Sequence, residues 1–102
     1  MGLNIETEQS PDETLIRVSG EVDLYSSPEL RKSILKTVPS ARGTLAIDLS
    51  GVTYIDSSGV ATLVEGLRSA GKNDTGFVLV SPSSAVMQVL ELARLDSVFE
   101  VR

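Results

Sequence analysis

The residues best placed to do chemistry lie in the segment 48–59, where an apolar strand pattern runs into an acidic residue, two serines and a glycine. Asp56 ends the strand pattern, and an amphipathic helical pattern begins at Ser57 or Ser58. The first N–H groups of a helix have no partners within the helix, and the helix dipole adds partial positive charge there. A serine at this point can therefore cap the helix or carry a phosphate. We predict a modifiable serine at a helix N-terminus.

A second acidic residue, Asp23, lies at the end of another predicted strand. Because the carboxyl ends of parallel strands meet at one edge of a sheet, we expect Asp23 and Asp56 to flank the same helix start. Simpler readings exist for both: Asp23 as a turn carboxylate, and residues 56–59 as a helix cap preceded by a solvated carboxylate. Both readings remain open at this point.

Composition limits the class of function. With 102 residues, 41% of them hydrophobic and 23% charged, the chain fits a single globular domain, residues 1–102. A net charge of −5 with nine Lys and Arg that form no cluster argues against nucleic-acid binding and favours a protein partner. No apolar run is long enough to span or insert into a membrane and no leader pattern is present, so we expect a cytoplasmic protein.

The residue types that are missing limit the chemistry further. The chain has no cysteine and no histidine, which removes thiol nucleophiles, the commonest general base and the usual zinc ligands. Its acidic residues are scattered, and only 4% of its residues are aromatic, so few side chains could line a substrate pocket. We therefore expect a binding module without a metal or a cofactor, and not an enzyme.

Strand and helix patterns alternate along the rest of the chain. A hairpin over residues 3–18 is followed by a helix near 28–38 with a serine cap at Ser26 or Ser27, and then by a buried strand at 45–49. A second helix is predicted to end near Gly71, which would serve as its left-handed cap. A strand follows at 77–80, and a third helix starts after Pro82. Residues 98–101 form a last strand or an extended tail. This order, ββαβαβαβ, predicts an α/β domain with a mixed, mostly parallel sheet and packed helices.

One motif at the end of the second helix is misleading. Residues 66–73 approach the phosphate-binding pattern G-x-x-x-x-G-K-[ST]. A phosphate-binding loop must follow a strand and open a helix, whereas these residues close one, and Asn73 replaces the hydroxyl that would bind magnesium. An ordinary glycine-capped helix end is the preferred interpretation.

Three segments, 20–23, 47–52 and 54–60, make the chain resemble the STAS-domain anti-sigma factor antagonists, which are bacterial partner-switching proteins. The resemblance implies a STAS-like fold and a partner that is both an anti-sigma factor and a serine kinase of the histidine-kinase-like ATPase type. It also implies that the unphosphorylated form releases the sigma factor and that phosphorylation of Ser57 switches binding off, with a phosphatase as a further partner. Asp23 matches the acidic position beside the serine, and Ser58 and Gly59 complete the loop.

The same resemblance leaves an alternative function. STAS domains also serve as regulatory or stabilising subunits of membrane ABC transporters for lipids, where the partner is the transporter ATPase and threonine often replaces the first serine. For the antagonist function, Leu24, Tyr25 and Val60 are predicted to make apolar contacts with the partner around Ser57, and Asp23 and Asp56 set the polarity of that surface. Leu63 is equally explained as a core residue.

Overall fold

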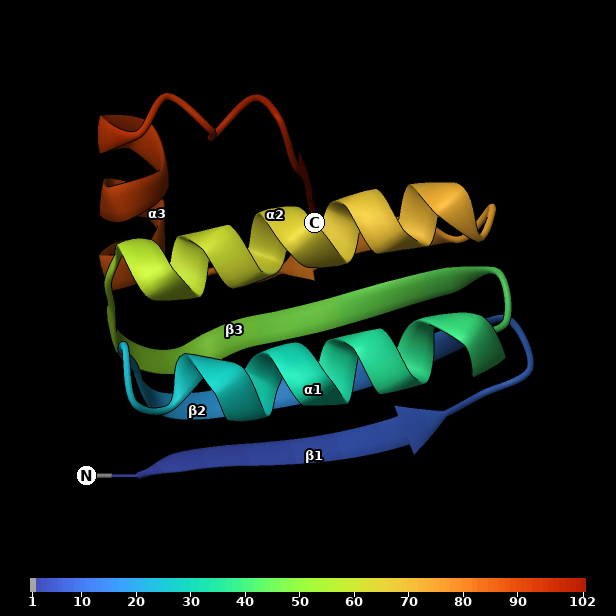
Figure 1. The fold of residues 1–102 in the computed structure, drawn as a ribbon. Coiled ribbons are helices and arrows are strands. Elements are labelled where there is room, and N and C mark those ends of the chain that lie inside the picture. The colour runs from blue at the N-terminus through green and yellow to red at the C-terminus, as the bar shows by residue number, and fades with distance from the viewer. Residues whose placement is uncertain (1) are drawn as a thin grey trace.

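In the computed structural model, which describes residues 2–102, a hairpin is followed by alternating helices and strands (Figure 1). The strands are β1 (Leu3–Gln9), β2 (Glu13–Val22), β3 (Thr44–Ile55), β4 (Gly76–Val80) and β5 (Glu100–Val101). The helices are α1 (Ser27–Thr37), α2 (Ser57–Lys72) and α3 (Ser84–Leu92), and a short 3-10 turn, Val38–Ser40, follows α1. The predicted α/β class and the order ββαβαβαβ are confirmed.

The strands lie in the sheet in the order in which they occur in the sequence. β1 pairs antiparallel with β2, and every other neighbouring pair is parallel, so the sheet is mixed and mostly parallel. The pairing of β2 with β3 extends to Val22 opposite Ile55, with one register shift between Arg17 and Ser19 and a second just after Gly20. Gly20 has a φ of +100°, a conformation that a side chain would strain. This irregularity bends the end of β2 just before the predicted site residues.

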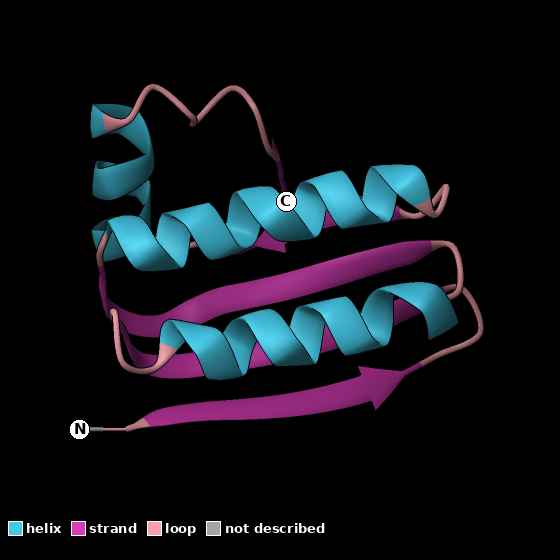
Figure 2. Cartoon of the chain, viewed as in Figure 1, coloured by secondary structure: helices cyan, strands magenta, loops and turns pink. Residues whose placement is uncertain are grey.

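Two helices cover one face of the sheet, and the third stands at its end. α1 and α2 lie side by side and run roughly along the direction of the strands, and α3 lies near the start of α2 (Figures 1 and 2). The pairing of β4 with β3 stops at Asp48, and the Ser83 N–H then donates to the Leu49 carbonyl, so that α3 packs beside the second half of β3. The largest fully buried side chains join these layers into one core: Ile16, Leu30, Ile34, Leu45, Ile47, Leu49, Leu63, Leu79 and Leu90.

Two helix ends differ from the sequence prediction. Ser26 occupies the N-cap position of α1 but makes no side-chain capping bond, because its hydroxyl donates to the Glu21 carbonyl instead. The left-handed glycine cap of α2 is wrong: Gly71 lies inside the helix, and the left-handed residue is Asp74, with a φ of 58°. The Asn73 side chain donates to the Ser69 carbonyl (2.9 Å) and so closes the helix end without a glycine.

The close approach of α2 to α1 and β4 depends on Gly66. A Cβ atom at this position would lie 2.9 Å from the Ile34 Cγ2 atom and 3.1 Å from the Phe77 ring. Gly71 lies in the same helix and has no atom within 4 Å of the corresponding point. The two glycines therefore differ in packing and share the same backbone conformation.

We expect the same substitution at these two glycines to have opposite effects. Gly71→Ala should raise the free energy of unfolding by about 0.4–1 kcal/mol, because alanine loses less backbone entropy in a helix. At Gly66→Ala that gain is opposed by overpacking, which typically costs about 1–3 kcal/mol. Urea unfolding should place Gly71→Ala above the wild type and Gly66→Ala below it. Equal stabilisation of both variants would contradict a tight α1–α2 contact at Gly66.

Candidate functional site

The parallel pairing of β2 with β3 places two acidic residues at one edge of the sheet. Val22 and Ile55 are opposite each other at the ends of these strands, and Asp23 and Asp56 follow them directly. The Asp56 N–H donates to the Val22 carbonyl across a distance of 3.1 Å. Neighbouring strands are about 4.8 Å apart, so the two turns that lead into α1 and α2 are also neighbours. The structure therefore brings Asp23 and Asp56 to the same edge, beside the start of α2.

Asp56, and not a serine, caps α2. Its backbone is extended, and its carboxylate oxygen Oδ1 accepts hydrogen bonds from the N–H groups of Ser58 (2.9 Å) and Gly59 (3.3 Å). The Asp56 carbonyl accepts the first bond within the helix, from the Val60 N–H. A carboxylate suits this position because it satisfies two free N–H groups and meets the positive end of the helix dipole. The capping role considered for a serine is thus filled by the residue before it.

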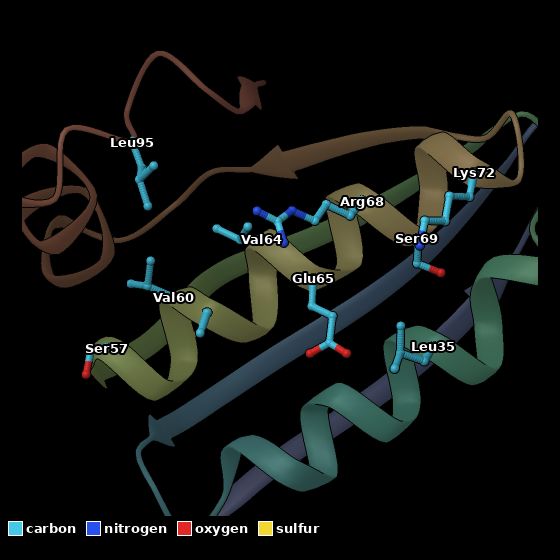
Figure 3. Close-up of a pocket in the computed structure, with 10 residues that line it drawn as sticks. Leu35, Ser57, Val60, Val64, Glu65, Arg68, Ser69, Lys72 and Leu95 are labelled. Carbon is cyan, nitrogen blue, oxygen red and sulfur yellow. The ribbon is translucent and has the colours of Figure 1, made fainter.

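Ser57 is the first residue of α2, and its side chain is exposed. Within residues 2–102 its hydroxyl makes no hydrogen bond, and it lies at the tip of the helix (Figure 3). Ser58 is partly buried, and its carbonyl accepts a hydrogen bond from the Thr62 hydroxyl (3.0 Å). Of the two adjacent serines, Ser57 therefore presents the accessible hydroxyl.

Asp23 organises the turn between β2 and α1. Its carboxylate accepts hydrogen bonds from the N–H groups of Tyr25 (2.9 Å) and Ser26 (3.0 Å), and its own N–H donates to the Ser26 hydroxyl (2.9 Å). The bond from the Ser26 N–H is the main cause that lowers the pKa of Asp23 below its ordinary value. Asp23 is therefore ionised at neutral pH and holds a fixed turn beside the start of α2.

This turn exposes two apolar side chains. Leu24 is 64% exposed and Tyr25 is 90% exposed, so neither contributes to the core. Tyr54, near the end of β3, is also half exposed. An exposed tyrosine next to an exposed leucine is a feature that protein interfaces favour. The structure leaves Leu24 and Tyr25 free to contact a partner, as their predicted role requires.

Gly59 and Val60 have a different environment from the one expected for contact residues. Val60 is only 6% exposed, so it contributes mainly to the core and reaches the surface only at its edge. Gly59 is buried, and a Cβ atom there would lie 2.6–2.7 Å from side-chain carbons of Ile55 and Val22. The glycine lets α2 begin directly against the strand ends. Leu63 is fully buried, which agrees with its interpretation as a core residue.

The sequence interpretation missed a groove along the outer surface of α2. It has a volume of about 760 Å³, and Ser57 lies at one end of it and Lys72 at the other (Figure 3). Two of its lining residues, Leu35 and Leu95, come from outside α2, so the pattern of α2 alone does not show the whole groove. A second stripe at spacings of three or four residues, which continues to Arg68 and Lys72, is the signal that could have revealed it.

Two kinds of feature are absent from residues 2–102. No helix in this part of the chain is long and apolar enough to cross a membrane. No group of three or more acidic, histidine or cysteine residues in the same range could hold a metal ion.

Comparison with known proteins places the chain in a family. The family model described as "Mlab, STAS domain" matches residues 5–100. The anti-sigma-B factor antagonist of Staphylococcus epidermidis is 28% identical over 101 residues, which cover 99% of this chain and 94% of that protein.

Solved structures of similar proteins agree with this family assignment. The crystal structure of an anti-sigma factor antagonist from Mycobacterium paratuberculosis is 30% identical and has a TM-score of 0.88, with 98% of this chain and 85% of that chain covered. The anti-sigma factor antagonist SpoIIAA in its unphosphorylated form shares the fold, with 21% identity, a TM-score of 0.80, and 97% and 88% of the two chains covered. The chain therefore belongs to the STAS-domain family, and the relatives that match nearly all of it are anti-sigma factor antagonists.

Proposed function

We propose that this protein is an anti-sigma factor antagonist and not an enzyme. In this proposal its unphosphorylated form binds a serine kinase of the histidine-kinase-like ATPase type that is also an anti-sigma factor, and binding releases the sigma factor. Phosphorylation of Ser57 by that kinase ends binding, and a phosphatase restores it. The names of the relatives support the antagonist function, and the resemblance of residues 54–60 supports Ser57 as the phosphoacceptor.

The observation that carries the proposal is that Asp56 and Ser57 have different roles at the start of α2. Asp56 supplies the cap, and Ser57 keeps an exposed hydroxyl with no hydrogen bond in the described residues. A kinase can reach this oxygen without first breaking a hydrogen bond of the helix. A modified Ser57 likewise leaves the cap intact.

The charge of a phosphate explains how the modification would act on binding. Phosphoserine adds about −1.5 to −2 charges at neutral pH, next to Asp56 and at the same edge as Asp23. An interface formed with a neutral hydroxyl would then have to bury this charge without a partner. An unpaired charge at an interface typically costs about 2–5 kcal/mol, which weakens binding some 30-fold to several thousand-fold.

The same charge should leave the free domain folded. The N–H groups of Ser58 and Gly59 are already bonded to Asp56, so the phosphate gains only the attraction of the helix dipole. Repulsion from the Asp56 carboxylate opposes that attraction. Because the two effects oppose each other at an exposed position, the net change in stability should be small.

A second candidate is a regulatory subunit of a lipid ABC transporter, whose partner is the transporter ATPase. The description of the matching family model, "Mlab, STAS domain", names a different protein from the antagonists, which is the reason for considering this second candidate. The serine at position 57, where such subunits often have threonine, favours the antagonist. Purified candidates of both partner classes, titrated against Ser57→Ala, would distinguish the two functions.

The phosphorylation site is tested with the kinase itself. Incubation of the protein with its kinase and ATP, followed by peptide mass mapping, should place one phosphate on Ser57. Ser58→Ala is the matched control and should still be phosphorylated, because its side chain is partly buried and lies next to an intact acceptor. Phosphorylation of Ser57→Ala at the wild-type stoichiometry would show that the acceptor is elsewhere.

Three variants at the start of α2 separate stability from binding. Asp56→Ala removes the cap and should lower the free energy of unfolding by about 0.5–2 kcal/mol. Ser57→Ala and Ser57→Asp should both stay within about 0.5 kcal/mol of the wild type, because they change an exposed, unbonded side chain. In calorimetric titration Ser57→Ala should bind the kinase and Ser57→Asp should bind it more weakly. If Ser57→Asp unfolds, or binds as tightly as Ser57→Ala, an electrostatic switch on an unchanged fold is wrong.

Tyr25 tests the turn as part of the interface. Tyr25→Ala should weaken kinase binding by at least about tenfold, as expected for an interface tyrosine, with almost no change in melting temperature because the ring is 90% exposed. Leu92→Ala, at the end of α3, removes another highly exposed apolar side chain and serves as the control. A large drop in melting temperature with unchanged affinity would assign Tyr25 to packing.

A further inference from the structure

The groove on α2 is continuous with Ser57. Its floor is formed by side chains at spacings of three or four residues along α2, from Ser57 through Val60, Ala61 and Val64 to Arg68 and Lys72. Leu35 of α1 and Leu95, between α3 and β5, form its two walls, and Leu95 extends toward α2 (Figure 3). Sixteen helical residues span about 24 Å, so the groove is as long as a helix of four to five turns.

The middle of the groove is apolar and incompletely covered. Val64, Leu35 and Leu95 are only partly buried, and Ala61 is exposed. The polar group beside them is already paired: Arg31 of α1 bonds Glu65 of α2, with an Nη2–Oε2 distance of 2.7 Å. This pair is neutral overall and fixes the distance between the two helices at the groove. A partner can therefore bury the apolar floor here without leaving this carboxylate unpaired.

The end of the groove far from Ser57 is basic. Arg68 and Lys72 lie one helical turn apart, and within residues 2–102 neither has an ion-pair or hydrogen-bond partner. The nearby carboxylate of Glu65 has its pKa lowered mainly by Arg31 and, more weakly, by Arg68. In a chain with a net charge of −5, two unpaired cations at the end of an apolar groove are the feature that an acidic partner would recognise.

We propose that this groove holds an acidic amphipathic helix of the anti-sigma factor, an inference that rests on the proposed function and extends its interface beyond Ser57. Apolar side chains of that helix pack on Ala61 and Val64, and carboxylates four residues apart pair with Arg68 and Lys72. Ser57 and Arg68 are separated by about 16 Å along α2, too far for a direct effect on each other. The phosphate then acts at one end of the interface, and the cations hold the other.

Two double variants, each of which removes two positive charges, test the basic end of the groove. Arg68→Gln/Lys72→Gln removes both cations of the groove, and Lys32→Gln/Lys36→Gln removes two exposed cations of α1 that do not line it. Calorimetric titration with the purified anti-sigma factor should show at least a tenfold loss of affinity for the groove variant and less than a threefold loss for the control. The affinity of the groove variant should also depend less on salt than that of the wild type.

A steric pair tests the apolar floor. Ala61→Arg places a large side chain in the groove at an exposed position, and Ala93→Arg does the same just after α3, outside it. Ala61→Arg should block binding and keep the wild-type melting temperature, and Ala93→Arg should change neither. When Ser57→Asp is combined with Arg68→Gln/Lys72→Gln, the fold-losses of affinity for the anti-sigma factor should multiply. This is the result expected for two separate parts of one interface.

Four outcomes would overturn the proposal. Wild-type affinity in both groove variants, with Ser57→Asp still weakened, would show that the interface stops at Ser57. Equal losses in the groove and α1 charge variants would assign the effect to net charge. Dimerisation of the protein in sedimentation experiments, abolished by Ala61→Arg with anti-sigma factor affinity unchanged, would assign the groove to a second copy. If neither the wild type nor Ser57→Ala binds an anti-sigma factor, the proposed function is itself wrong and the groove proposal fails with it.

Discussion

The hydrogen bonds from the Asp56 carboxylate to the N–H groups of Ser58 and Gly59 are the interaction on which the rest of the site depends. They fix where α2 begins, and they leave the hydroxyl of Ser57 without a structural task. Gly59 allows this start to lie directly against Ile55 and Val22, because any side chain there would collide with them. The proposed phosphoacceptor is thus held on a rigid support to which it contributes little, so its modification would leave the fold unchanged.

The second constraint is the parallel pairing of β2 with β3, which brings two turns far apart in the sequence to one edge. Val22 opposite Ile55 sets the position of Asp23 relative to Asp56, and the bulge after Gly20 bends the end of β2. Asp23 then uses its carboxylate to hold its own turn, which leaves Leu24 and Tyr25 exposed. Each carboxylate at this edge therefore shapes a loop near the start of α2.

Local patterns were enough to predict the element order, because long amphipathic helices and a buried strand have clear periodicities. They failed where several chemically similar residues compete for one role. Asp56 and Ser57 are both good capping residues, and only the backbone geometry shows that the carboxylate takes the N–H groups. Gly71 and Asn73 compete in the same way at the other end of α2, and there the amide side chain supplies the closing bond. The stripe of residues along α2 could have indicated the floor of the groove but not its walls, which come from α1 and from the loop after α3 and reach α2 only in the tertiary fold.

The charge distribution along α2 gives the proposed switch its direction. The Asp56 carboxylate already accepts from the N–H groups of Ser58 and Gly59 at the N-terminal end, so a new negative charge at Ser57 does not gain these two donors. The available positive charge lies at the other end, on Arg68 and Lys72, about 16 Å or more away along the helix and screened by water and salt. A phosphate on Ser57 therefore cannot be neutralised within the domain. Its cost falls on any partner that must desolvate it, so one covalent change can control binding without a change of fold.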